Sequence, residues 1–136
     1  LILALGQTPV ADPATGLAAE ELASCVTRTL ELPEVAALRK FLHPEFVIYS
    51  AKAEDGQETA TVGIADALTF TESGLPDVVV DWKSDVDPAP GALKHYQEQV
   101  QTYLDITHAM RGMIVFMSTG RVVEVRPTKA LVDSIL

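Results

Sequence analysis

The sequence predicts one α/β domain in which helices pack against a mixed β-sheet. Three observations predict this class. The chain has 136 residues, which suits a single domain around one core. Hydrophobic residues make up 48% and charged residues 21%, a composition typical of folded globular chains. Segments with helical and with strand periodicity follow in the order two helices, three strands, one helix and two strands.

The N-terminal part predicts an irregular arm followed by two helices. Residues 1–16 are interrupted by glycines and prolines, so we expect an arm or linker there, and the folded domain after it. Apolar residues recur near helical spacing over residues 17–30, with acids in the first turn, where the helix dipole favours them. Pro33 favours the start of a second short helix over residues 34–42, which Pro44 ends.

Three strands are predicted next. The segments 46–53, 59–71 and 78–84 are rich in residues that favour strands. Gly56 marks the first turn between them, and the polar stretch 72–77 marks the second. Two hairpins are therefore expected in this part of the chain.

The C-terminal part predicts a helix and two further strands. Residues 85–91 form an Asp/Pro/Gly loop, and the segment 94–108 contains no helix-breaking residue, so it is expected to be helical. The segments 112–117 and 121–125 are strand-like and flank a turn. The last ten residues are expected to form a short helix.

Composition limits the function. The formal net charge of −9 argues against a self-sufficient nucleic-acid binder, because phosphate affinity comes mainly from Lys and Arg. The single cysteine, Cys25, excludes an internal disulfide and a cysteine zinc cluster and fits a reducing, cytoplasmic compartment. The apolar start Leu1–Leu5 is too short for a signal peptide or a membrane span, so no membrane partner is expected.

Two acids occupy strands that should be buried. If the 72–77 turn centres on Ser73 and Gly74, antiparallel pairing sets Asp66 opposite Asp81. Opposed side chains lie roughly 4.5 to 5.5 Å apart at Cβ, where like charges are destabilising unless something compensates them. A hard divalent cation such as Mg²⁺ or Mn²⁺ is the natural compensator.

Strand alternation adds a cation to this pair. It places Asp81 and Lys83 on one face of their strand and Trp82 on the other, where Trp82 is expected to be core. Two carboxylates and an ammonium on rigid sheet could hold Mg²⁺ and a scissile phosphate. The alternative is a solvated strand face. Two further acids, Asp85 and Asp87, are expected to be solvated loop residues.

Three motifs in this order resemble a known family. A Gly63-Ile64-Ala65-Asp66 strand leads through a hairpin to Val79-Val80-Asp81-Trp82-Lys83, and a helix then carries Gln99-x-x-x-Tyr103. Together they resemble the RecB-like branch of the PD-(D/E)xK nuclease superfamily, most of all the C-terminal nuclease domains of UvrD-type helicase-nucleases such as AddA and RecB. The resemblance spans roughly residues 18–126. It implies a restriction-endonuclease-like three-layer sandwich, with a mixed central sheet flanked by helices.

The resemblance also implies an activity and a site. The activity is Mg²⁺-dependent (or Mn²⁺-dependent) hydrolysis of DNA, of exonuclease type, in DNA repair and recombination. The expected partners are single-stranded DNA, the remainder of a longer helicase chain of which residues 17–136 are one domain, and a partner subunit. The implied residues are the metal-binding Asp66 and Asp81, the Trp82 carbonyl as a further ligand, the catalytic Lys83, and the supporting Gln99 and Tyr103.

One expected ligand is replaced. Relatives carry a metal-binding His or Glu on the first helix, and Thr27 stands where the His is expected; Glu21 or Glu31 could substitute if the helix turns suitably. A second hypothesis is therefore a degenerate nuclease fold that serves docking or DNA guidance within a helicase complex. A third is a stand-alone α/β domain whose acids are coincidental.

Overall fold

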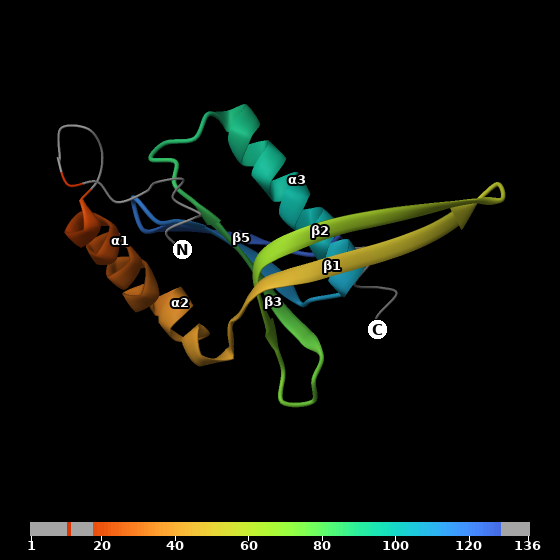
Figure 1. Ribbon diagram of the computed structural model, residues 1–136, viewed down its shortest axis with the longest axis horizontal. Coiled ribbons are helices and arrows are strands. Elements are labelled where there is room, and N and C mark those ends of the chain that lie inside the picture. Colours follow the sequence, from red (N-terminus) through yellow and green to blue (C-terminus); the bar gives the residue numbers. More distant parts are fainter. Residues whose placement is uncertain (1–10, 12–17, 129–136) are drawn as a thin grey trace.

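Five strands form one mixed sheet in the computed structural model of the chain, which describes Ala11 and residues 18–128 (Figure 1). The spatial order equals the chain order: β1 (His43–Glu54), β2 (Gln57–Phe70), β3 (Pro76–Lys83), β4 (Arg111–Phe116) and β5 (Arg121–Val125). All neighbouring strands pair antiparallel except β3 and β4, which are parallel. A parallel pair needs a crossover, and helix α3 (Pro90–Thr107) supplies it.

Helices cover both faces of this sheet. Helix α1 (Ala19–Glu31) and the single-turn helix α2 (Pro33–Ala36) lie on one face, followed by a 3₁₀ turn, η1 (Arg39–Phe41). Helix α3 lies on the other face. The expected α/β class with a mixed sheet between helices is therefore what the described residues form.

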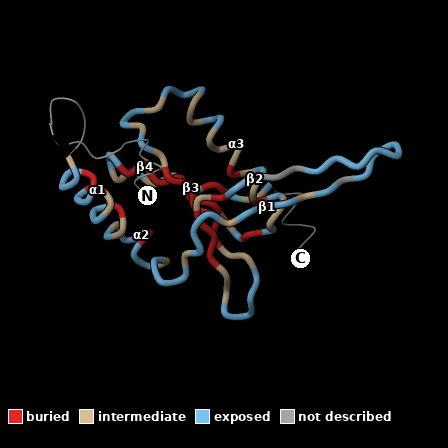
Figure 2. Tube along the Cα trace, viewed as in Figure 1, coloured by how far each residue is buried: buried red, intermediate tan, exposed pale blue. Residues whose placement is uncertain are grey.

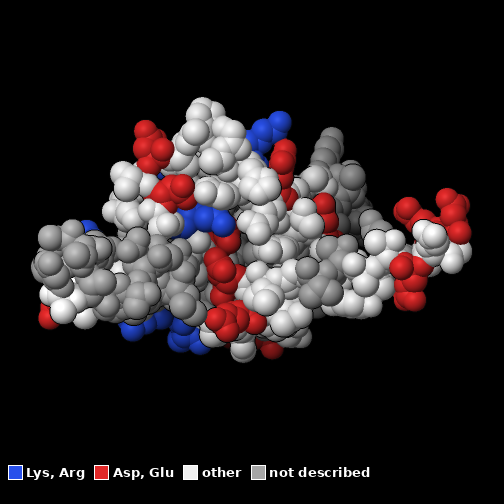
Figure 3. Space-filling model, turned by 45° about the horizontal axis from the view of Figure 1, so that its top comes forward, with Lys and Arg blue, Asp and Glu red and all other residues white. Residues whose placement is uncertain are grey.

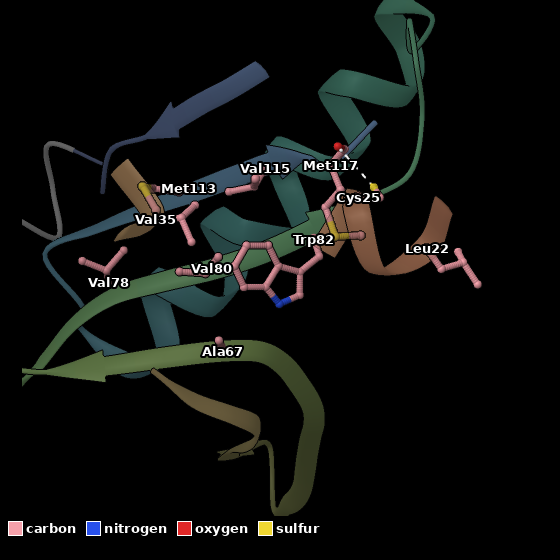
Figure 4. Close-up of a cluster of buried hydrophobic side chains, with 10 residues drawn as sticks. All are labelled: Leu22, Cys25, Val35, Ala67, Val78, Val80, Trp82, Met113, Val115 and Met117. Carbon is pink, nitrogen blue, oxygen red and sulfur yellow. Dashed lines mark hydrogen bonds between the residues drawn. The ribbon is translucent and has the colours of Figure 1, made fainter. Parts of the chain in front are cut away.

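Alternation along β3 builds two cores. Val78, Val80 and Trp82 face the α1 side, where they pack with apolar residues that include Leu22 and Cys25 (Figure 4). Val79 faces the α3 side and belongs to a second cluster, whose buried members from α3 and β4 are Val100, Leu104, Ile114 and Phe116. Because β3 is covered on both faces, a polar side chain on it is also removed from water.

Several boundaries differ from the prediction. The predicted helix over 34–42 is only the single-turn α2 followed by η1, because the backbone tightens to i→i+3 hydrogen bonds, such as Phe41 N–H to the Leu38 carbonyl, before β1 begins. Helix α3 begins at Pro90 rather than after the predicted 85–91 loop, since proline is compatible with the first helical turn. The predicted arm and the predicted C-terminal helix lie outside the described residues, apart from Ala11 and residues 127–128.

The β1–β2 hairpin projects from the sheet. Its outer half extends away from the helices (Figure 1), and residues 53–60 around its tip are exposed (Figure 2). Acidic side chains gather at its tip, where Glu54, Asp55 and Glu58 are exposed (Figure 3). Among the described residues, no helix is long and apolar enough to cross a membrane.

Candidate active site

Asp81 and Lys83 lie at the carboxyl end of β3 on the face covered by α3. Trp82, between them, is 8% exposed and packs in the α1 cluster (Figure 4). The predicted alternation of these three side chains is confirmed. A carboxylate and an ammonium from one strand therefore share one face of the sheet.

The pairing of β2 with β3 follows the predicted register, but the ladder ends one residue before Asp66 and Asp81. Ala67 pairs with Val80, so continuing the ladder would set Asp66 opposite Asp81. The ladder between the two strands stops there, and β2 continues into the projecting hairpin. The backbone N–H of Trp82 instead donates a hydrogen bond to Oδ2 of Asp66 at 2.8 Å. The Asp66 side chain thus replaces the missing ladder bond at this edge of β3.

The Trp82 carbonyl faces the same edge. The Lys83 carbonyl accepts a hydrogen bond from the Met117 N–H at 2.9 Å, so Lys83 points its backbone groups toward β4. Backbone direction alternates along a strand, and both groups of one residue point to the same neighbour. The Trp82 N–H and C=O therefore both face the β2 edge of β3, and the N–H bonds Asp66 there. The Trp82 carbonyl, the predicted further metal ligand, thus lies at the same edge of β3 as the Asp66 carboxylate.

Asp81 is a buried acid with an incompletely bonded carboxylate. It is 4% exposed, and Oδ2 lies 3.1 Å from the Lys83 ammonium. Lys83 is therefore the ion-pair partner of Oδ2, and no well-aligned hydrogen bond reaches that oxygen from the part of the chain that the structure describes. Burial raises the pKa of Asp81 to about 7 against the opposing pull of Lys83, and Asp66 raises it further by its charge and by accepting a hydrogen bond from the protonated form.

Two residues outside the predicted site contact Lys83 or its neighbours. The Lys83 ammonium lies 4.4 Å from the ring centroid of Tyr96, and the Tyr96 hydroxyl donates to Oδ2 of Asp85 at 3.0 Å. Asp85 is half-buried and accepts this hydrogen bond, so it is not only a solvated loop acid as predicted, whereas Asp87 is exposed. The i, i+13 separation of Lys83 and Tyr96 across a loop leaves no sequence signal for this contact.

Gln99 and Tyr103 share one face of α3, as their spacing predicts. The Gln99 amide donates to the Tyr103 hydroxyl at 3.3 Å, and that hydroxyl donates to the Ile64 carbonyl at 3.3 Å. Gly63 is required beside them, since a Cβ there would lie 2.9 Å from the Tyr103 ring. This pair fixes α3 to β2 two residues before Asp66, and none of its hydrogen bonds goes to Asp81 or Lys83.

The first helix adds no metal ligand to this group. In the described part of the chain, no set of three or more His, Cys, Asp or Glu side chains is placed to share a metal ion. Thr27 is exposed on α1, which packs on the opposite face of the sheet from Asp81. Oε2 of Glu21 accepts a hydrogen bond from the Ala18 N–H at 3.3 Å and thereby caps the helix. The structure joins neither Glu21 nor Glu31 to the two aspartates.

Comparisons with known proteins place the fold only. No family model matches the chain, and no curated protein matches it. A solved structure, named as the crystal structure of SSO0001, matches with a TM-score of 0.55 at 21% identity, over 86% of this chain and 60% of that chain. The chain therefore shares its fold with that protein while spanning 60% of its length.

Proposed function

We propose that this chain is a Mg²⁺-dependent nuclease domain that hydrolyses DNA phosphodiester bonds, with a fold of the restriction-endonuclease-like, RecB-like type. One observation carries the proposal. A nine-tenths-buried carboxylate, Asp81, keeps an oxygen without a hydrogen bond, beside a second carboxylate and a lysine. Lys83 offsets the cost of this buried acid only in part, because burial and Asp66 still raise the pKa of Asp81, and a bound cation would complete the compensation.

The donor set fits a magnesium ion. Asp66 and Asp81 supply carboxylate oxygens, and the Trp82 carbonyl points to the same edge of β3. Mg²⁺ prefers hard oxygen ligands and retains several waters, so two carboxylates and a carbonyl suffice for it. A cation here would also offset the burial and, after it, the Asp66 charge that raise the pKa of Asp81.

Each residue then has a distinct task. When bound, Mg²⁺ supplies Lewis-acid activation of the phosphodiester and of the attacking water. The two aspartates orient the ion, and Asp66 also fixes the edge of β3 through the Trp82 N–H. The Lys83 ammonium, 20% exposed at the rim, places a positive charge where negative charge develops on phosphate oxygen. Gln99 and Tyr103 hold α3 against β2 beside the site.

The proposal includes its context. We infer that the substrate is single-stranded DNA, cut by exonuclease action in repair or recombination in the cytoplasm, and delivered by a UvrD-type helicase in the same chain or complex. The net charge of −9 supports the inference that another part of the chain or complex binds the DNA while this domain cuts it. A domain this acidic needs cations from another part to hold DNA.

Two contacts favour a second candidate, a degenerate nuclease fold that serves docking or DNA guidance. Asp66 already stabilises β3 through the Trp82 N–H, and Asp81 already pairs with Lys83. Both acids therefore have a structural role without a metal. The described residues also place no third acid or histidine with them. This candidate predicts a folded domain that neither binds Mn²⁺ at Asp81 nor cuts DNA.

Metal binding and cleavage together separate the candidates. The chain, alone and within its parent protein, would be titrated with Mn²⁺ by electron paramagnetic resonance. It would also be incubated with end-labelled single-stranded DNA and Mg²⁺ or Mn²⁺. We expect Asp81→Asn and Asp66→Asn to weaken Mn²⁺ binding at least tenfold, and both of these variants and Lys83→Gln to lower cleavage at least a hundredfold.

Asp77→Asn is the matched control, because Asp77 lies on the same strand and is outside the carboxylate pair. It should bind Mn²⁺ and cut DNA as the wild type does. If the wild type binds Mn²⁺, Asp81→Asn does not bind it, and no form of the chain cuts DNA, the domain binds a metal but is not a nuclease. If the wild type neither binds Mn²⁺ at Asp81 nor cuts DNA, the degenerate nuclease fold is favoured.

A further inference from the structure

Lys83 needs more than Asp81 to hold its ammonium in place. Its side chain is a flexible four-carbon stem whose ordering is opposed by rotamer entropy. The ion pair with Asp81, at 3.1 Å, is not a well-aligned hydrogen bond. A second contact would oppose this entropy and help to keep the ammonium at the carboxylate.

The Tyr96 ring supplies that contact. The Lys83 ammonium lies 4.4 Å from the ring centroid, inside the roughly 6 Å range of cation–π attraction. Tyr96 comes from α3 and Lys83 from β3, so the ammonium lies between a carboxylate on the sheet and an aromatic ring on the covering helix. Only 20% of the Lys83 side chain is exposed, which limits competition from water.

The ring is itself held by two groups. Its hydroxyl donates to Oδ2 of Asp85 at 3.0 Å, and Asp85 follows β3 directly in the loop that leads to α3. Its ring lies 6.5 Å, centroid to centroid, from Phe116, which is fully buried and pairs in register with Lys83 on β4. Tyr96 is thus fixed to the strand end, the loop and the neighbouring strand.

We propose that Tyr96 is a positioning residue whose ring, which lies over the Lys83 ammonium and beside Phe116, holds that ammonium against Asp81. The catalytic meaning of this contact rests on the proposed nuclease function, but the contact itself does not. The ring, rather than the hydroxyl, acts on Lys83.

Chemical labelling tests the contact without activity. The folded chain and its variants would be treated with limiting acetic anhydride, and acetylation of Lys83 would be measured by mass spectrometry relative to Lys94, whose side chain is 77% exposed. In Tyr96→Leu we expect Lys83 to be acetylated roughly three- to thirtyfold faster, the range that a lost cation–π contact corresponds to. Tyr96→Phe keeps the ring and should stay within about twofold of the wild type. Tyr49→Leu, on the exposed hairpin, is the matched control and should change nothing.

Cleavage kinetics supply the second readout. Tyr96→Leu should lower kcat on single-stranded DNA by about tenfold or more with little change in KM, and Tyr96→Phe should restore most of kcat. Urea unfolding of each variant confirms that the compared chains are folded. Unchanged Lys83 labelling in a folded Tyr96→Leu chain, or equal effects in the Phe and Leu variants, would overturn the inference. Failure of the wild type to cut DNA would instead reject the proposed function, and the labelling result would still decide the contact.

Discussion

Asp81 is the residue of the proposed site whose burial costs the fold most. It is buried on a strand covered by helices, and ionisation in such a place is unfavourable. Lys83 offsets part of this cost, and the neighbouring Asp66 adds to it. The result is a carboxyl group that titrates at about pH 7 in the folded chain and near 3.8 when unfolded.

The Asp81 pKa predicts how stability changes with pH in the metal-free chain. Between pH 4 and 7 the folded chain keeps a proton on Asp81 that the unfolded chain has lost. Asp81 therefore contributes stability at low pH, and this contribution falls as pH rises toward 7. Comparison with Asp81→Asn, by urea unfolding in EDTA from pH 4.5 to 8, isolates it. We expect the wild type to lose a few kcal/mol relative to the variant over this range.

The control is Asp77→Asn on the same strand, whose difference from the wild type should stay constant across the range. If the free energies of unfolding of the wild type and Asp81→Asn change with pH in parallel, the pKa of Asp81 is not raised by folding.

At the scale of elements, the divergence of β2 from β3 creates the site. The two strands pair up to Ala67 and Val80, and β2 then belongs to the projecting hairpin. The uncovered edge of β3 presents the Trp82 N–H and C=O, and Asp66 bonds the first of these. A strand that had stayed paired would have used both groups in its ladder and left no oxygen for a ligand.

The contact between α3 and β4 depends on Gly112. A Cβ at this position would overlap the Val100 side chain of α3, which is fully buried. We expect Gly112→Ala to lower the free energy of unfolding by about 1–3 kcal/mol, because a close-packed core resists added volume. Urea unfolding measures this.

Gly91→Ala is the matched control, since Gly91 lies in α3 with nothing near its added Cβ. It should be neutral or stabilising by up to about 1 kcal/mol, as alanine favours helix. Equal effects of the two substitutions would show that α3 is not packed on β4 at Gly112.

At the scale of the whole molecule, the chain divides into a three-layer core and the projecting hairpin. No described side chain between residues 49 and 62 is buried, whereas Ile48 at the base is 2% exposed and packs in the α3 cluster. The outer hairpin is therefore separable from the core that carries Asp81.

Shortening the hairpin tests this division. With residues 51–60 replaced by an Asn-Gly turn, we expect Tm to change by less than about 5 °C and the emission spectrum of Trp82 to stay that of a buried indole. Ile48→Ala, at the hairpin base, should by contrast cost about 2–4 kcal/mol in urea unfolding. A shortened chain that fails to fold would show that the outer hairpin belongs to the core.

Much of the fold could be predicted because its signals are local. Turn residues and period-two alternation located the five strands and the β2–β3 register, and i, i+4 spacing set Gln99 and Tyr103 on one helical face. Local signals failed where packing decided the outcome. Helix α2 ends at Ala36 and a 3₁₀ turn follows it, and α3 extends back to Pro90. The contact of Tyr96 with Lys83 joins a helix to a strand across a loop, so no short-range pattern encodes it.

The sequence by itself determined which residue types share a strand face, because side chains alternate along any β-strand. It therefore fixed Asp81 and Lys83 on one side and Trp82 on the other. Only the tertiary structure decided that Asp81 is buried without a hydrogen bond to Oδ2, that Asp66 meets Trp82 through its side chain, and that Tyr96 lies over Lys83. These depend on which helix covers the strand and where β2 leaves it, and both follow from packing between segments distant in sequence.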